Sequence, residues 1–185
     1  MEKILRFCLL FVLPLFAAVQ PLSDMRNADV VRQQFEESCG AAALATLINL
    51  IDKTQKLNEA SVLDKLGNTT DMVSFSALSK VAKEFGYENA AYKMTREVFE
   101  RLTVPVLVKV EDDPKYPHFI VVLNHVGDFV TIFDPSFGRY ISTKREFYRI
   151  WDLDTQGGYA LILLPKHTAF SAPYVGSRIF FEMRR

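Results

Sequence analysis

The sequence is poor in cysteine and histidine and has no excess charge of either sign. Its 185 residues include two cysteines and three histidines, and 22 Lys and Arg are balanced by 22 Asp and Glu. Without a net positive charge the protein lacks the electrostatic field that attracts phosphates or anionic lipids, so nucleic acid is not expected as a partner. So few thiols and imidazoles also make a four-ligand zinc site hard to assemble.

Several common motifs are missing as well. The chain contains no GxSxG, HExxH, phosphate-binding-loop or dinucleotide-binding pattern, so no cofactor and no metal is expected. What it does have is 49% hydrophobic and 24% charged residues, over a length that suits one hydrophobic core. One globular domain is therefore expected.

The N-terminal segment differs from the rest of the chain. Lys3 and Arg6 precede an uncharged apolar run from Phe7 to Val19, and Ala17 provides a small residue near its end. This pattern is typical of a secretory signal peptide, so we expect residues 1–20 to be removed on export to the periplasm or the extracellular space. Two alternatives fit the same run: a retained anchor, although spanning a bilayer takes about 20 apolar residues, and an apolar helix packed on the domain.

Export changes how the cysteines are interpreted. Cys8 lies inside the predicted signal peptide, so Cys39 would be the one thiol of the mature protein and no intramolecular disulfide could form. A lone thiol in an oxidising compartment calls for an explanation in reactivity. The alternative is a small apolar core residue, which is a common role for cysteine.

Helices are predicted in the first half of the domain. The Ala- and Leu-rich run 39–51 predicts a helix buried on most sides, with Ser38 as its N-cap. Asn58 is expected to cap a short helix that ends before Gly67, and Ser74 to cap a longer helix that ends before Gly86.

Strands follow in the second half. NAAYKM is compatible with an extended segment, and PVLVKV, HFIVVLN, FVTIFD and YALILLP are typical of strands. Thr95 is expected to cap a short helix, and a further helix is expected near Lys144 to Trp151. Helices followed by an antiparallel sheet indicate an α+β domain over residues 29–165, with no role predicted for the tail 166–185. His125, in a predicted turn, and His167, in the tail, are expected to be solvated.

Cys39 is predicted at the first position of its helix. Unpaired backbone N–H groups and the positive end of the helix dipole stabilise a thiolate there. Gly40 is expected to leave room for a substrate carbonyl. The position alone is equally compatible with a cysteine that starts a buried helix.

The hairpin HFIVVLN–FVTIFD predicts a partnership between a histidine and a carboxylate. If His125 to Gly127 form a three-residue loop, His118 lies directly opposite Asp134 on the same face of the sheet. The carboxylate would then orient the imidazole and leave its other nitrogen for a thiol. An ordinary cross-strand polar pair is the alternative, and a two-residue turn at Gly127 and Asp128 would separate the two side chains.

These residues carry a family resemblance. The segments QQFEESCGAAALATLIN, VSFSALSKVAKEFGY, TVPVLVKV, HFIVVLN, FVTIFDPSFG and GYALILLP resemble the bacteriocin-processing or double-glycine leader peptidases, which are papain-like cysteine peptidases. The resemblance runs from Val30 to Pro165. Its most specific element is Gln33, six residues before the pair Cys39 and Gly40.

The resemblance implies a papain-like fold and a role for each of four residues. Cys39 would be the nucleophile, His118 the general base and acid, Asp134 the orienting carboxylate and Gln33 the oxyanion donor. Gln34 is a neighbouring candidate for the last role, but its spacing from the cysteine does not match the family pattern. Ser38 departs from the family, which usually has an acidic residue before the nucleophile.

The resemblance also implies a class of substrate. The chain looks like a stand-alone exported member without transporter domains, similar to those encoded with secretion or functional-amyloid systems. We expect a cysteine endopeptidase that cleaves an extended segment or leader of an exported protein, after small residues such as Gly-Gly. A fibre subunit or a secretion-system component is the expected partner. The alternatives are a peptide-binding or chaperone module that does not cut, and an enzyme that transfers the acyl group to an amine.

Overall fold

The computed structural model describes residues 21–112 and 116–164, which leaves the predicted signal peptide 1–20 and the tail 166–185 outside the described residues. Among the described residues, no helix is long and apolar enough to cross a membrane. The helices are α2 (Leu22–Asn27), α3 (Cys39–Ile51), α4 (Glu59–Lys65), α5 (Phe75–Glu84), α6 (Arg96–Glu100) and α7 (Lys144–Trp151). The strands are β1 (Asn89–Met94), β2 (Val106–Val110), β3 (His118–Asn124), β4 (Phe129–Asp134), β5 (Gly138–Thr143) and β6 (Gly158–Leu163).

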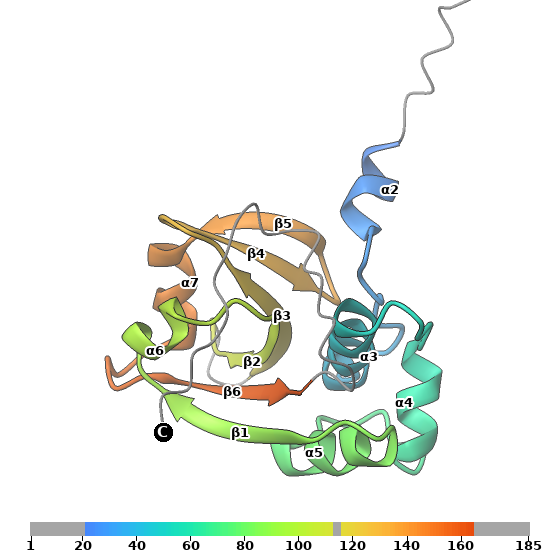
Figure 1. Ribbon diagram of the computed structural model, residues 1–185. Helices are drawn as coiled ribbons and strands as arrows, with labels where there is room; N and C mark the ends of the chain where they lie inside the picture. The colour runs from blue at the N-terminus through green and yellow to red at the C-terminus, as the bar shows by residue number, and fades with distance from the viewer. Residues whose placement is uncertain (1–20, 113–115, 165–185) are drawn as a thin grey trace, which may run out of the picture.

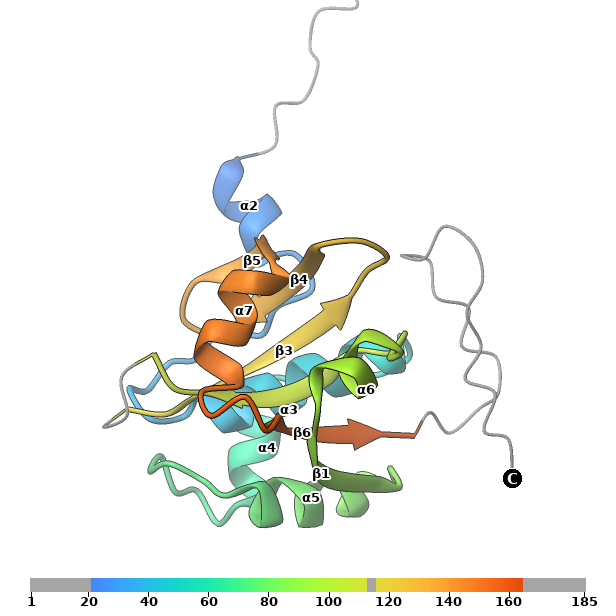
Figure 2. The same cartoon turned by 90° about the vertical axis from the view of Figure 1, so that its left-hand side faces the viewer.

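The strands form one antiparallel sheet in the order β1-β6-β2-β3-β4-β5. Helices α3, α4 and α5 gather on one side of this curved sheet, and α6 and α7 lie on the other (Figure 1). Seen after a quarter turn, α2 stands beside β4 and β5 at the end of the molecule away from α5 (Figure 2). The α+β fold with leading helices and an antiparallel sheet is confirmed.

Strand β3 is covered on both faces, which explains its continuous apolar sequence. Phe119, Val121 and Leu123 belong to the core shared with α3. Ile120 and Val122 belong to the second core, which contains side chains of α6 and α7. The two cores therefore hold the middle of β3 from both sides, and His118 is the first residue of this strand.

The predicted register of the β3–β4 hairpin is wrong by two residues. Asn124 pairs with Val130, so the loop is longer than three residues, although Gly127 has the expected positive φ of 87°. An even shift keeps every side chain on its face, because the side-chain period of a strand is two. His118 and Asp134 thus share a face as diagonal neighbours instead of direct partners.

Two of the four predicted helix caps are confirmed. The side chains of Asn58 and Ser74 accept hydrogen bonds from the first turns of α4 and α5. Ser38 and Thr95 make no such bond. For Ser38 the physical reason is that its hydroxyl oxygen accepts instead from the backbone N–H of Phe35, at 3.2 Å, while the hydroxyl donates to the buried carboxylate of Glu59.

Gly40 has a different role from the one its sequence position suggests. A Cβ built on it would lie 2.5 Å from Cγ2 of Val73 and 3.3 Å from Cδ2 of Phe119. The space beside its Cα is therefore filled by protein. Glycine at this position lets the first turn of α3 pack closely against β3, next to His118.

Candidate active site

Cys39 is the first residue of α3 and is only 3% exposed. It belongs to the main hydrophobic core, as the core-residue alternative requires. Its thiol also interacts with the imidazole of His118 and helps to raise the pKa of that ring, which a purely apolar role does not need. The structure thus places the predicted nucleophile beside the predicted base.

The imidazole of His118 is held on its other side by Asp134. Nε2 of His118 lies 2.9 Å from Oδ1 of Asp134, and the two side chains are 25% and 5% exposed. The same Oδ1 accepts hydrogen bonds from the backbone N–H groups of Ser136, at 2.7 Å, and Phe137, at 3.2 Å. Because Asp134 engages Nε2, the nitrogen left for Cys39 is Nδ1.

The surroundings of His118 favour its charged form. Burial alone lowers the pKa of His118, but hydrogen bonds and charge interactions with Asp134 and Cys39 outweigh it and raise the pKa from 6.5 to about 9. An imidazolium beside a cysteine favours the thiolate. The surroundings therefore favour the imidazolium form of His118 near neutral pH.

Tyr140 of β5 flanks the carboxylate of Asp134. Asp134 pairs with Gly138, which makes Tyr140 a diagonal neighbour on the same face of the sheet. Burial, and the nearby charge of Asp134, raise the pKa of Tyr140 to about 12. Tyr140 therefore stays protonated near neutral pH.

A recess of about 240 Å³ opens on this side of the His118–Asp134 pair. Two of its aromatic walls are well exposed: Tyr116 (69%) and Phe137 (64%). Its lining consists of Val110, Asp112, Tyr116, His118, Ile120, Ile132, Asp134, Phe137, Tyr140, Ser142, Glu146, Phe147, Arg149 and Ile150. The partly exposed His118 and the buried Asp134 thus border a space that solvent reaches.

Gln33 is anchored to the turn that follows Asp134. Its Oε1 accepts a hydrogen bond from Oγ of Ser136 at 2.8 Å. Its Nε2 donates to the carbonyl oxygens of Phe35 and Glu36, both at 2.9 Å. The structure therefore connects Gln33 to Asp134 through Ser136, with the amide hydrogens directed into the loop that leads to Cys39.

The neighbouring Gln34 is arranged differently. It is exposed, and its backbone N–H donates to both carboxylate oxygens of Glu59, at 3.0 and 3.2 Å. Between the two glutamines, only Gln33 has a side-chain hydrogen bond to the turn after Asp134. This contact favours Gln33 over Gln34 as the residue that belongs to the site.

Sequence reasoning missed several residues that support the site. Arg32 donates through Nε to the carbonyl of Pro135 at 2.9 Å and through a terminal nitrogen to the carbonyl of Ser136, so it clamps the turn after Asp134. Tyr140 and Glu59 were missed too. The sequence holds no local signal for these contacts, since each joins segments that only the fold brings together.

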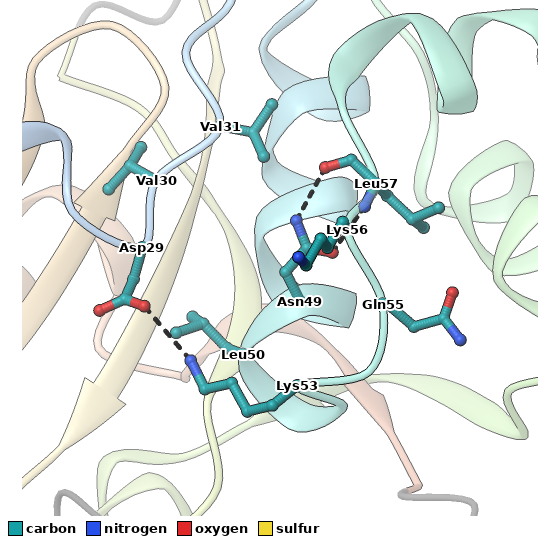
Figure 3. Close-up of a pocket in the computed structure, with 9 residues that line it drawn as sticks. All are labelled: Asp29, Val30, Val31, Asn49, Leu50, Lys53, Gln55, Lys56 and Leu57. Carbon is teal, nitrogen blue, oxygen red and sulfur yellow. Dashed lines mark hydrogen bonds and ion pairs between the residues drawn. The ribbon is translucent and has the colours of Figure 1, made fainter.

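A second recess, of about 360 Å³, lies at the opposite end of α3 (Figure 3). Figure 3 shows Lys53 paired with Asp29 at 3.3 Å and Asn49 bonded to the backbone of Leu57. Asn49 is ten residues along the helix from Cys39, a rise of about 15 Å. The recess is therefore separate from the candidate active site. Its lining residues are Asp29, Val30, Val31, Asn49, Leu50, Lys53, Gln55, Lys56 and Leu57.

The other histidines lie apart from the site. His125 lies in the loop after β3, where it is half-buried, and its Nε2 lies 2.7 Å from Oγ1 of Thr131. His167 lies outside the described residues. Over 21–112 and 116–164, no group of three or more His, Cys, Asp or Glu is arranged to hold a metal ion.

Comparisons with protein-family models, with individual sequences and with solved structures agree with one another. The sequence model of the peptidase C39 family matches residues 27–168. The "Probable functional amyloid protease FapD" of Pseudomonas aeruginosa is 27% identical over 143 residues, which cover 74% of this chain and 63% of that protein. The transport and processing protein LagD of Lactococcus lactis is 26% identical over 151 residues, which cover 79% of this chain and 20% of LagD. The chain therefore spans less than two thirds of these relatives.

Solved structures show the same fold. The peptidase domain of Streptococcus ComA, a bi-functional ABC transporter, superposes with a TM-score of 0.64 at 23% identity, covering 74% of this chain and 98% of that domain. A double glycine motif protease from an AMS/PCAT transporter, in complex with the leader peptide, gives 0.62 at 24% identity, covering 74% and 90%. The expected papain-like fold is confirmed. Because the family model covers most of the chain, the protein belongs to the peptidase C39 family of cysteine peptidases.

Proposed function

We propose that this protein cleaves an extended segment or leader of an exported protein, with Cys39 as nucleophile, His118 as general base and acid, and Asp134 as the orienting carboxylate. The observation that carries the proposal is the position of His118 between two partners: its pKa is raised by the neighbouring Cys39 thiol, and its Nε2 lies 2.9 Å from Oδ1 of Asp134. A nucleophile, a base and a group that orients the base are what covalent catalysis by a thiol requires.

In this mechanism His118 holds the proton of Cys39 on Nδ1, and the thiolate attacks the peptide carbonyl carbon. The C=O electrons move onto oxygen, and the tetrahedral intermediate collapses as His118 gives its proton to the leaving amine. A thioester remains on Cys39. Water then loses a proton to His118 and attacks the thioester, which releases the acid and restores the thiol.

The oxyanion formed in both steps needs hydrogen-bond donors. The backbone N–H of Cys39 is suited to this role, because the first N–H groups of a helix have no acceptor within the helix. We propose the side chain of Gln33 as the second donor. Since its Nε2 bonds to the Phe35 and Glu36 carbonyls, one hydrogen must turn toward the substrate oxygen during the reaction.

The burial of Cys39 supports a preference for small residues at the cut. Cys39 is only 3% exposed, so we expect small residues such as glycine beside the scissile carbonyl to approach its thiol more easily than bulky ones. The relatives FapD and LagD are named for functional-amyloid and lactococcin G processing, respectively. We therefore propose cleavage after a small pair such as Gly-Gly, in an exported fibre subunit or a secretion-system protein.

Export of the protein itself belongs to the same proposal. Its support is the charged and then apolar pattern of residues 1–20. N-terminal sequencing of protein recovered from the periplasm or medium is expected to find this segment removed. An intact Met1 on protein recovered from the cytosol would contradict the export.

A non-cleaving peptide-binding module is a second candidate. It is favoured by one specific observation, that both Cys39 and the amide hydrogens of Gln33 are occupied by protein contacts. The experiment that separates the two functions asks whether a variant without the thiol supports secretion or assembly in the cell. Folded Cys39→Ala protein should fail to support secretion or assembly if cleavage is the role, and should support it as well as wild type if binding is sufficient.

A further inference from the structure

Glu59 is a buried carboxylate that directs its oxygens at the loop before the nucleophile. It is the first residue of α4 and is 2% exposed. Its two oxygens accept from the backbone N–H of Gln34, at 3.0 and 3.2 Å, and Oε1 also accepts from the hydroxyl of Ser38. Its carboxylate thus binds two loop donors, the Gln34 N–H and the Ser38 hydroxyl.

These two contacts fix both ends of the segment that separates Gln33 from Cys39. Ser38, at the near end, lies 2.8 Å from the carbonyl of Phe35 and accepts from the Phe35 N–H at 3.2 Å, which closes the loop on itself. The Phe35 carbonyl that is held in this way is also an acceptor of the Gln33 side chain. A connected path therefore leads from Glu59 through the loop to the Gln33 amide.

We propose that Glu59 is a positioning residue that orients the Gln33 side chain on the oxyanion side of the site. The kinetic test of this inference rests on the proposed peptidase function. Without the carboxylate, the Gln34 N–H and the Ser38 hydroxyl lose their buried acceptor, and an unsatisfied buried donor is costly. The loop then relaxes toward water, and the Gln33 amide loses its defined direction.

The chain offers a matched control for a merely structural effect. Asn58 is the exposed cap of the same helix, and Asn58→Ala weakens α4 without removing a bond to the loop. Glu59→Ala is the test variant. If it does not fold, Ser38→Ala removes one of the same contacts between Glu59 and the loop. Glu59→Gln keeps an oxygen for the Gln34 N–H and is the conservative rescue.

Kinetics should separate positioning from stability. We expect Glu59→Ala to lower kcat roughly tenfold to a hundredfold while KM changes by less than about twofold, and Glu59→Gln and Asn58→Ala to stay within about threefold of wild type. The double variant Gln33→Ala/Glu59→Ala should have a kcat less than about threefold below that of Gln33→Ala alone, because the side chain that Glu59 positions is already gone. Alkylation of Cys39 by iodoacetamide should be unchanged, since that displacement forms no oxyanion.

A second readout does not depend on cleavage. The side-chain NH₂ resonances of Gln33 in the NMR spectrum should move in Glu59→Ala and Ser38→Ala but keep their wild-type positions in Asn58→Ala. Resonances that stay in place in both loop variants would overturn the inference, as would fully multiplicative kinetic effects of Glu59→Ala and Gln33→Ala. If wild type cleaves nothing while the Gln33 resonances respond as expected, the proposed function fails and the positioning role stands.

Discussion

Asp134 is not directly opposite His118 in the β3–β4 hairpin, yet its Oδ1 lies 2.9 Å from Nε2 of His118. The contact forms because the two residues share a face and both stand at the same end of their strands. Two backbone N–H groups of the following turn bind the same oxygen, so the carboxylate position is set independently of the imidazole. This arrangement makes Asp134 suited to orient His118 and to stabilise its charge.

Replacement of the carboxylate by an amide should separate orientation from charge. Asp134→Asn keeps an oxygen for the backbone N–H groups of Ser136 and Phe137, so we expect the fold to persist. The loss of negative charge should lower the pKa of His118 and reduce kcat by roughly a hundredfold. Circular dichroism checks that the fold persists, and steady-state kinetics measures the fall in kcat. Wild-type kcat in the folded variant would show that Asp134 is not the orienting group.

The raised pKa of His118 predicts a pH dependence of stability. Since the pKa is about 9 in the folded protein and 6.5 is its ordinary value, the native state holds the proton more tightly than the unfolded state. This contribution is fully present below pH 6.5 and is lost as the pH rises through about 9. Urea unfolding of wild type should therefore show stability that falls over that window. His118→Gln, with no titrating ring, should lack this part of the slope, and equal slopes would contradict the prediction.

The thiol of Cys39 should react with iodoacetamide near neutral pH in the folded protein. The helix N-terminus and the imidazolium of His118 both favour the thiolate, and His118→Ala should slow the reaction. Mass spectrometry of the modified protein over time gives the rates. A Cys39 that reacts only in denaturant would support the role of a buried core residue.

The oxyanion assignment predicts unequal effects for the two neighbouring glutamines. Gln33→Ala should reduce kcat by about a hundredfold to a thousandfold, or about 2.7–4 kcal/mol, because one donor to the oxyanion is lost. Gln34→Ala is the matched control and should stay close to wild type, since its loop contact is made by the backbone. Equal rates for wild type and Gln33→Ala on a cleaved substrate would show that another group stabilises the oxyanion.

Much of the candidate site could be predicted because its residues follow from local patterns in the sequence. The Ala- and Leu-rich run starting at Cys39 predicts a buried helix, and strand alternation places His118 and Asp134 on one face even though the loop length was wrong. Gln33 was indicated by the family spacing alone. None of these predictions required knowledge of how distant segments pack.

The remainder could not be predicted because it depends on tertiary contacts. Ser38 has the chemistry of an N-cap, but its hydroxyl oxygen accepts from the backbone N–H of Phe35 and its proton goes to the buried carboxylate of Glu59 in α4. The space beside the Cα of Gly40 was expected to be open, and only the packing of Val73 and Phe119 shows that it is filled. Tyr140 reaches Asp134 through the β4–β5 pairing, for which the sequence carries no signal.

The packing at Gly40 gives a stability prediction of its own. Gly40→Ala should destabilise the fold by about 1–3 kcal/mol, although alanine is the better helix former, because its Cβ would overlap Val73. Chemical unfolding at 25 °C measures the change. Adding Val73→Ala should recover part of the loss, and a Gly40→Ala protein as stable as wild type would show that the space is open.

The most direct test of the account is whether Cys39 becomes acylated by a peptide. The protein would be mixed with a peptide thioester ending in Gly-Gly, and its intact mass followed by rapid-quench mass spectrometry. The account predicts a transient mass increase equal to the peptidyl group on wild type, followed by release of the free acid, and no adduct on folded Cys39→Ala. Absence of both adduct and product from folded wild type, or equal product from Cys39→Ala, would contradict catalysis by this thiol.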